Sequence, residues 1–314
     1  MAAMSASPLV LSAEDVVYAI DRAVPPRLRL AAPATVTIAT LDARAGRLTR
    51  PEEVEATAPD YRDRFPRANP ATGPIFVDGA EPGDQLSAEI LAIDPAPRGY
   101  SLIKPGFGVI ADMVERPLVR FAEVRDGAID FAGVRLPLRP MVGVIATAPE
   151  GEPVGTAHVG RHGGNLDCNL VAVGATVHLP VRVPGALFYL GDVHATMGDG
   201  EVSGSGFEIA ARITLRLALR KGEATEWPWL ETADRIVTLA SAPTFDDAAE
   251  AAVRAMIPRI MARHRVSATD AYMLASIRGD LRVNQACRSP IDTSVRFEFP
   301  RFRGARPAEG ASSS

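Results

Sequence analysis

Two stretches of this chain alternate between apolar and polar residues, and this period of two constrains the fold more than any other feature. Every second residue is apolar in 207–219, and the same alternation runs through 175–183. Successive side chains of a β-strand point to opposite faces, so both stretches predict strands with one apolar face. The alternation predicts that Glu208 is a charged-face partner of Arg212 and that His178 is a polar-face strand residue.

Further short strands are predicted in the first half of the chain. The segment ATVTIATL at 34–41 is rich in β-branched residues and ends at Asp42. Residues 73–94 contain a short apolar strand, a Glu-Pro-Gly-Asp turn and an alternating strand, which predicts a β-hairpin. Residues 50–72 are charged and punctuated by prolines, which predicts a long surface excursion.

Helix signals occur only near the C-terminal end. Thr244 and Ser267 are each followed three residues later by an aspartate, as at the start of a capped helix. The two predicted helices cover 246–264 and 267–281, and Pro258 is expected to kink the first of them. The chain therefore predicts an α+β fold in which β-structure predominates.

The domain organisation follows from the absence of a low-complexity linker in the central part of the chain. We predict one intertwined domain over 18–302. Residues 1–17 are expected to form a loosely held N-terminal arm, and the small polar residues at 303–314 a disordered tail.

Composition excludes several classes of function. The chain has 314 residues, a net charge of −4 and a pI near 5.8, so it offers no basic surface for nucleic acid. No apolar run approaches the ~20 residues of a membrane helix. The first dozen residues lack the features of a secretory signal, so we expect a cytoplasmic protein. We also expect a homo-oligomer whose ligand is a small molecule.

Acidic and histidine residues gather between His158 and Glu208. Four of the five histidines lie there, among several aspartates, glutamates and glycines. From Val183 to Ala211 there is no lysine or arginine to neutralise them. Each acid taken singly could serve a turn, but the whole set favours a bound cation, because carboxylates and neutral imidazoles are common metal ligands.

Four motifs give the chain a resemblance to a known family. They are GPIFVDGAEPGD at 73–84, HGGNLDC at 162–168, LPVRVPGALFYLGDVHATMGDGE at 179–201 and DAYMLASIRGDLRVNQ at 270–285. Together they resemble the acetamidase/formamidase family, over a span from about Tyr18 to Pro300. The resemblance implies a β-sandwich or jelly-roll-like fold with a helical pair, and hydrolysis of a short aliphatic amide to carboxylate and ammonia.

The resemblance also implies which positions form the site. The family's motif positions fall on Asp42, His162, Asn165, Asp167, Asp192, His194, Asp199 and Glu201. Two departures are visible. Met197 stands where the family usually has glutamine, and the stretch 204–208 differs from the usual small-Ala-small-Glu run.

Amide hydrolysis then assigns a role to most of these residues. We expect Asp42, Asp192 and His194, with Asp167, to hold a divalent metal, zinc in the first place and calcium in the second. Glu201 is expected to be the general acid and base. His162 or Asn165 is expected to donate a hydrogen bond to the developing oxyanion.

Two alternatives remain open at this point. A cysteine nucleophile at Cys168, served by Lys104, would reach the same products by covalent catalysis. A non-catalytic binder of metal or small molecules could also have kept the fold and lost turnover, which the departures at Met197 and Phe207 suggest.

Overall fold

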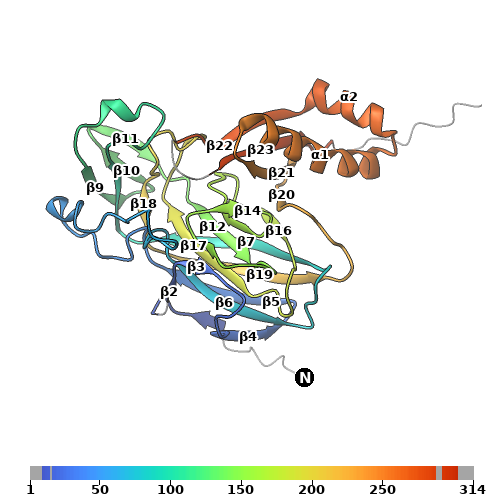
Figure 1. Cartoon of the computed structure of the whole chain (residues 1–314), viewed down its shortest axis with the longest axis horizontal. Coiled ribbons are helices and arrows are strands. Elements are labelled where there is room, and N and C mark those ends of the chain that lie inside the picture. The colour runs from blue at the N-terminus through green and yellow to red at the C-terminus, as the bar shows by residue number, and fades with distance from the viewer. Residues whose placement is uncertain (1–8, 15, 288–291, 303–314) are drawn as a thin grey trace, which may run out of the picture.

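The computed structural model describes residues 9–14, 16–287 and 292–302 (Figure 1). Two large mixed sheets make up most of it, with a pair of helices near the C-terminal end. The prediction of a predominantly β fold with a late helical pair is confirmed. No helix within the described part of the chain is long and apolar enough to cross a membrane. The predicted tail at 303–314 lies outside the described residues.

The first sheet contains nine strands within the described ranges. In spatial order they are β1 (Leu9–Leu11), β5 (Ala34–Thr40), β19 (Ala211–Arg220), β7 (Gln85–Pro95), β16 (Thr176–Pro180), β20 (Trp229–Glu231), β21 (Arg235–Ala242), β23 (Thr293–Pro300) and β22 (Asp280–Gln285).

The second sheet contains twelve strands among the residues described. Its main path is β11 (Val134–Pro137), β10 (Ala128–Phe131), β9 (Leu118–Arg125), β8 (Arg98–Ile103), β18 (Glu208–Ile209), β17 (Phe188–His194), β12 (Met141–Thr147), β15 (Gly163–Asn165) and β14 (Val159–Gly160). Strand β6 (Ala71–Asp78) pairs with β17 and also with β2 (Val16–Val17) and β4 (Leu28–Ala31). A small separate pair joins β3 (Ala19–Ile20) to β13 (Val154–Gly155).

The main core lies between the two sheets. Ile38 and Ile213 of the first sheet belong to the same fully buried cluster as Val142 and Leu190 of the second. The apolar faces predicted by alternation therefore meet each other, as in a sandwich. Strand β17, which carries motif residues, and its neighbour β12 are buried along their whole length. The polar groups of β17 therefore lie inside the protein.

The helical pair covers the other end of the first sheet (Figure 1). Helix α1 (Phe245–His264) and helix α2 (Ala268–Arg278) begin where predicted, and the hydroxyls of Thr244 and Ser267 accept the backbone N–H of the residue three positions on. The buried stripe of α1 consists of Ala248, Ala252, Met256 and Ile260. The helical period of the sequence predicts a face made of Ala249, Val253, Met256, Ile257, Ile260 and Met261. Of these, Met256 and Ile260 are buried, and Val253, Ile257 and Met261 pack against the same cluster. Two short 3-10 helices, η1 (Pro51–Glu53) and η2 (Ala111–Met113), lie in connections.

Three strand predictions are corrected by the pairing. Strands β6 and β7 do not form the hairpin predicted for 73–94, because they belong to different sheets and the turn between them crosses the sandwich. The alternation at 207–219 is divided between β18 and β19, which also lie in different sheets. Part of the predicted N-terminal arm is not loosely held, because β1 pairs with β5 and β2 with β6. Alternation reports which face is apolar, but it does not report the pairing partner.

Candidate functional site

Five acidic and histidine side chains converge at one place inside the second sheet. Ligand-type atoms of Asp167, Asp192 and His194 lie within 4.8 Å of one another, and those of His194, Glu201 and Glu208 do so as well. The five are almost completely buried, between 1% and 7% exposed. His194 belongs to both groups, so it stands at their centre.

Neighbouring strands bring three of these residues together. Asp192 and His194 lie at the end of β17, and their side chains approach to 3.9 Å between Oδ1 and Nε2. Glu208 of β18 is the direct cross-strand partner of His194, with 3.2 Å between Oε2 and Nε2. The prediction that Glu208 is a charged-face partner of Arg212 is therefore wrong. The pattern failed because the strand breaks after Ile209 and the two halves face different layers.

Gln285 bridges Asp167 and Glu201 through hydrogen bonds. It lies within the last of the four motifs but was not predicted as a site residue. Its side-chain amide donates 2.8 Å hydrogen bonds to Oδ2 of Asp167 and to Oε2 of Glu201. The same Asp167 oxygen accepts the side-chain amide of Asn165, whose own oxygen accepts Nδ2 of Asn69 at 3.1 Å. Asn165 therefore orients Asp167.

Close backbone packing makes room for the acids. A Cβ atom on Gly143 would lie 2.7 Å from Oδ1 of Asp167 and 3.1 Å from Oδ2 of Asp192. A Cβ atom on Gly206 would lie 2.8 Å from Nδ1 of His194. Only glycine permits such an approach. Gly206 lies in the glycine-rich run noted in the sequence, whereas Gly143 was missed because it lies on a strand far from the motifs.

The backbone at three of the acids is strained. Asp167, Asp192 and Glu201 have φ angles of 41°, 52° and 40°, in the left-handed region that non-glycine residues seldom occupy. Such conformations persist where the surrounding structure holds them and are frequent at functional sites. The strained backbone at these three acids therefore fits a functional site.

The electrostatics of the cluster are unfavourable without a cation. Burial raises the pKa of Asp167 well above its usual range, and the charge of Glu201 raises it further. The pKa of Asp192 is raised in the same way by burial and by the charge of Glu208. Burial lowers the pKa of His194, but the carboxylates of Glu208, Asp192 and Asp167 together outweigh burial, so the net pKa is raised. Five buried atoms of the cluster have no hydrogen-bond partner among the described residues. They are Oδ1 of Asp167, Oδ1 of Asp192, both ring nitrogens of His194 and Oε2 of Glu208. Buried polar atoms are rarely left so, and this donor set fits a divalent cation.

A small cavity opens onto the cluster. It holds about 50 Å³ and is lined by Asp192, Glu201, Glu208, Asn165 and Gln285 together with Arg44, Lys104, Tyr61, Phe107 and Cys287. One water needs at least ~10 Å³ on this scale, so the cavity has room for a few water-sized groups. It therefore suits a ligand with only a few non-hydrogen atoms.

Three of the predicted site positions, Asp42, His162 and Asp199, are not part of the cluster. Asp42 belongs to neither group, and its carboxylate accepts the backbone N–H of Arg44 at 2.8 Å and of Gly46 at 3.2 Å and the hydroxyl of Tyr100 at 2.9 Å. His162 is 6% exposed and outside both groups, and burial followed by the charge of neighbouring His158 lowers its pKa to about 4.

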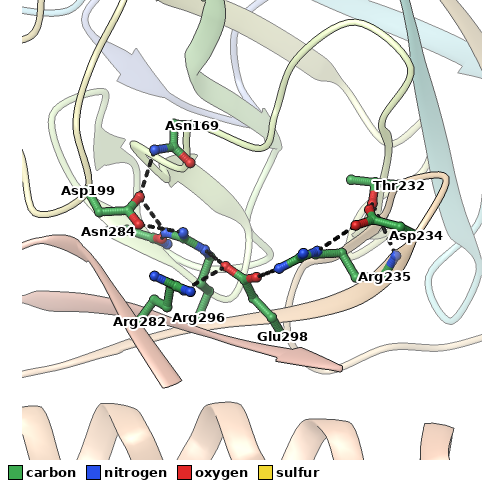
Figure 2. A network of polar contacts seen from close by, with 9 residues as sticks. All are labelled: Asn169, Asp199, Thr232, Asp234, Arg235, Arg282, Asn284, Arg296 and Glu298. Atoms are coloured by element: carbon green, nitrogen blue, oxygen red, sulfur yellow. Dashed lines mark hydrogen bonds and ion pairs between the residues drawn. The ribbon is translucent and has the colours of Figure 1, made fainter. Parts of the chain in front are cut away.

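Asp199 is neutralised by a residue distant in sequence (Figure 2). Arg296 donates to its two oxygens at 2.9 and 2.7 Å, and to Glu298 at 2.7 Å. Asn169 also donates to Asp199, at 2.7 Å. Backbone hydrogen bonds between Gly200 and residues 284 and 286 tie the same loop to β22. The network thus anchors the loop that carries Glu201.

The two cysteines and His178 lie in different environments. Cys168 is fully buried in the main core, and burial raises its pKa to about 11. Cys287 lines the cavity instead, and burial raises its pKa to about 12. His178 is fully buried rather than facing solvent, is stacked on Trp229 at 3.9 Å and accepts or donates hydrogen bonds with Ser87 and Glu231.

The chain is similar to a known family of proteins. The sequence model of the Acetamidase/Formamidase family matches residues 20–154 and 151–288. The chain belongs to the acetamidase/formamidase family. Within the family, the crystal structure of an acetamidase from Bacillus halodurans has a TM-score of 0.86 to this structure and is 37% identical, covering 93% of this chain and 97% of that one.

Curated relatives within the family match over a smaller part of their length. The formamidase of Methylophilus methylotrophus is 25% identical over 227 residues, which is 52% of this chain and 55% of that protein. The acetamidase of Mycolicibacterium smegmatis is 27% identical over 223 residues, 48% of this chain and 53% of that protein. The chain thus spans about half the length of these two family members.

Proposed function

We propose that this protein hydrolyses a short aliphatic amide, of the formamide or acetamide type, to carboxylate and ammonia. The observation that carries the proposal is the convergence of Asp167, Asp192, His194, Glu201 and Glu208, with their unpartnered atoms, beside a cavity of about 50 Å³. A space of that size favours a substrate of three to five non-hydrogen atoms over a larger one. The names of the family relatives support the same class of substrate.

The cation is the second part of the proposal. Asp167, Asp192 and His194 would hold a divalent ion, with Glu208 as a further ligand through Oε2, which accepts no hydrogen bond from the described residues. Zinc is the preferred ion and calcium the second candidate, because the set mixes one imidazole with several carboxylates. Such an ion supplies a Lewis acid for the amide carbonyl and lowers the pKa of water.

Glu201 is proposed to move the protons. It lines the cavity, and burial raises its pKa, which suits a group that both accepts and returns a proton. The water oxygen bonds to the carbonyl carbon while Glu201 takes a proton from that water. Glu201 then passes the proton to the amide nitrogen, the C–N bond breaks and ammonia leaves. Gln285 keeps the Glu201 carboxylate in place through its 2.8 Å hydrogen bond.

Covalent catalysis by a cysteine is the alternative route to the same products. Cys287, Lys104 and Glu201 line the same cavity, whereas Cys168 is in the core. A raised pKa of about 12 keeps the Cys287 thiol protonated, which disfavours it as a nucleophile. The metal route is therefore preferred over both cysteines.

Ammonia release from formamide, acetamide and propionamide tests the proposal, together with metal analysis of the purified protein. Turnover with a stoichiometric divalent ion supports it. A protein that binds the ion and releases no ammonia from any of the three amides would be the non-catalytic binder instead. A homo-oligomer and a cytoplasmic location stay predictions, which light scattering and cell fractionation would test.

A further inference from the structure

Two cationic side chains line the cavity that contains the acids, and neither pairs with an acid. Arg44 is 6% exposed, and its Nε is buried without a hydrogen-bond partner. Lys104 lines the same cavity, and its Nζ lies 3.4 Å from the ring centroid of Phe107 and 4.2 Å from that of Tyr61. Within the described ranges neither side chain has an ion pair.

The fold holds both cations in these positions. Arg44 lies in the turn that Asp42 closes by accepting the backbone N–H of Arg44 at 2.8 Å. Lys104 directly follows β8, and the two rings against it lie 5.2 Å apart. These contacts position Lys104 through its aromatic neighbours and not through a carboxylate.

It is unfavourable for two cations to line one cavity when neither has an ion-pair partner among the described residues. Burial, followed by the neighbouring Arg44 charge, lowers the pKa of Lys104 to about 7. Burial raises the pKa of Glu208, but His194, the Ser205 hydroxyl and Arg44 lower it, and the net pKa is lowered. Unpaired buried charges are rarely retained unless a ligand satisfies them. The cavity is thus lined by carboxylates (Asp192, Glu201 and Glu208) and by two cations (Arg44 and Lys104).

We propose that Arg44 and Lys104 form the oxyanion and carboxylate subsite of this cavity. The inference rests on the proposed amide hydrolysis. The two cations would donate hydrogen bonds to the carbonyl oxygen as it gains negative charge, and then hold the carboxylate of the product. This assignment replaces His162 and Asn165, because Asn165 donates to Asp167 and His162 lies outside both acid groups and the cavity lining.

The subsite explains why the cavity needs charges of both signs. The carboxylates hold the metal ion and transfer the proton, whereas Arg44 and Lys104 stabilise the negative charge that develops on the carbonyl oxygen. Preorganised donors at a developing oxyanion each contribute ~10²- to 10³-fold in kcat. The ligand class is a short carboxylate, such as formate or acetate, and the amide that yields it.

Lysine labelling tests the subsite without measuring turnover. The chain has two lysines, and Lys221 is ion-paired with Asp84 at 2.5 Å, so it is a built-in control. Reductive methylation at pH 7.5, followed by mass spectrometry of peptides, should modify Lys104 faster than Lys221. Acetate should protect Lys104 and leave the Lys221 rate unchanged. Equal rates at Lys104 with and without saturating acetate would overturn the subsite, whether or not the protein hydrolyses amides.

Kinetics of two variants supply the second test. Lys104→Met should lower kcat by ~10²- to 10³-fold and weaken inhibition by acetate. Wild-type activity should decline as pH rises through about 7, because Lys104 loses its charge. Lys104→Arg should keep most of the activity without this decline, because arginine stays charged. The other titratable groups facing Lys104 are Arg44, Tyr61 and Cys287, and the last two have raised pKa values. Unchanged kcat and acetate inhibition in Lys104→Met would contradict the subsite.

If wild type hydrolyses no short amide, the proposed function fails, but acetate protection of Lys104 still decides the subsite. If wild type is active and acetate gives no protection, the subsite fails alone.

Discussion

The Nε2 atom of His194 lies 3.2 Å from Oε2 of Glu208, across the paired strands β17 and β18. Both side chains are buried, at 1% and 4% exposed. The pair joins the two groups of ligand-type residues, since His194 is common to both. Glu208 therefore belongs to the site, and its other oxygen is held by a 3.0 Å hydrogen bond from the hydroxyl of Ser205.

Glu208→Gln should keep the fold and weaken metal binding. The amide is isosteric with the carboxylate, but it removes one negative charge from the group around the ion. We expect metal affinity to fall by at least ~10-fold, as for changes to groups that orient or bind a metal ligand. Competition with a chromogenic chelator measures the metal affinity. The control is Glu250→Gln, at an exposed position of α1. Equal affinity in both variants would remove Glu208 from the ligand set.

Asp192→Asn and His194→Ala should each lose bound metal as well as turnover. Asp42→Asn should keep the metal, because its carboxylate is committed to hydrogen bonds outside both groups. Metal content by mass spectrometry and ammonia release, measured on all three variants, distinguish the two ligand assignments. Loss of metal in Asp42→Asn would restore Asp42 as a ligand.

Glu201→Gln should lower turnover by ~10²- to 10⁴-fold and leave the metal content close to wild type. Cys287→Ala and Cys168→Ala should cost little turnover, with a modest packing penalty for the buried Cys168. A folded Cys287→Ala protein without activity, or an acyl group trapped on that thiol, would favour covalent catalysis instead.

Gly143→Ala should displace Asp167 and Asp192 and reduce metal binding. The added Cβ would lie 2.7 Å from Oδ1 of Asp167, closer than real Cβ contacts allow. Gly151→Ala is the matched control, since its added Cβ has no atom within 4 Å. Metal affinity and circular dichroism of both variants would be compared. A Gly143→Ala protein with wild-type affinity would mean that the acids are not held by this packing.

Lys104→Met should stabilise the folded protein at neutral pH. The pKa of Lys104 is about 7 in the folded state against 10.5 ordinarily, so between these values the unfolded chain binds more protons. Stability of the wild type therefore rises with pH over that window, and the cost of the buried cation is greatest at and below about pH 7. Urea unfolding from pH 6.5 to 9.5 should show the advantage of Lys104→Met shrinking as pH rises. Lys221→Met should give no such gain, because it loses the ion pair with Asp84.

Local sequence was sufficient for several elements. Strand β5 and the starts of α1 and α2 were predicted because β-branched runs and capping residues act within a few positions. The motif positions Asp167, Asp192, His194 and Glu201 do converge, since they lie close in sequence on paired or adjacent segments. The hairpin at 73–94 was wrong, because it depends on which strand packs alongside.

The sequence by itself determined the period of the strands, the capped helix starts, the family and most of the acid and histidine cluster, all of which are local patterns. Only the tertiary structure decided the partner of each charge. Asp199 looked unneutralised in its own segment but pairs with Arg296, and Glu208 meets His194 and not Arg212. Gln285 and Arg44 reach the cavity from the two ends of the chain. Electrostatic partners depend on distances in space, and these are set by sheet register and by layer crossings that no local period contains.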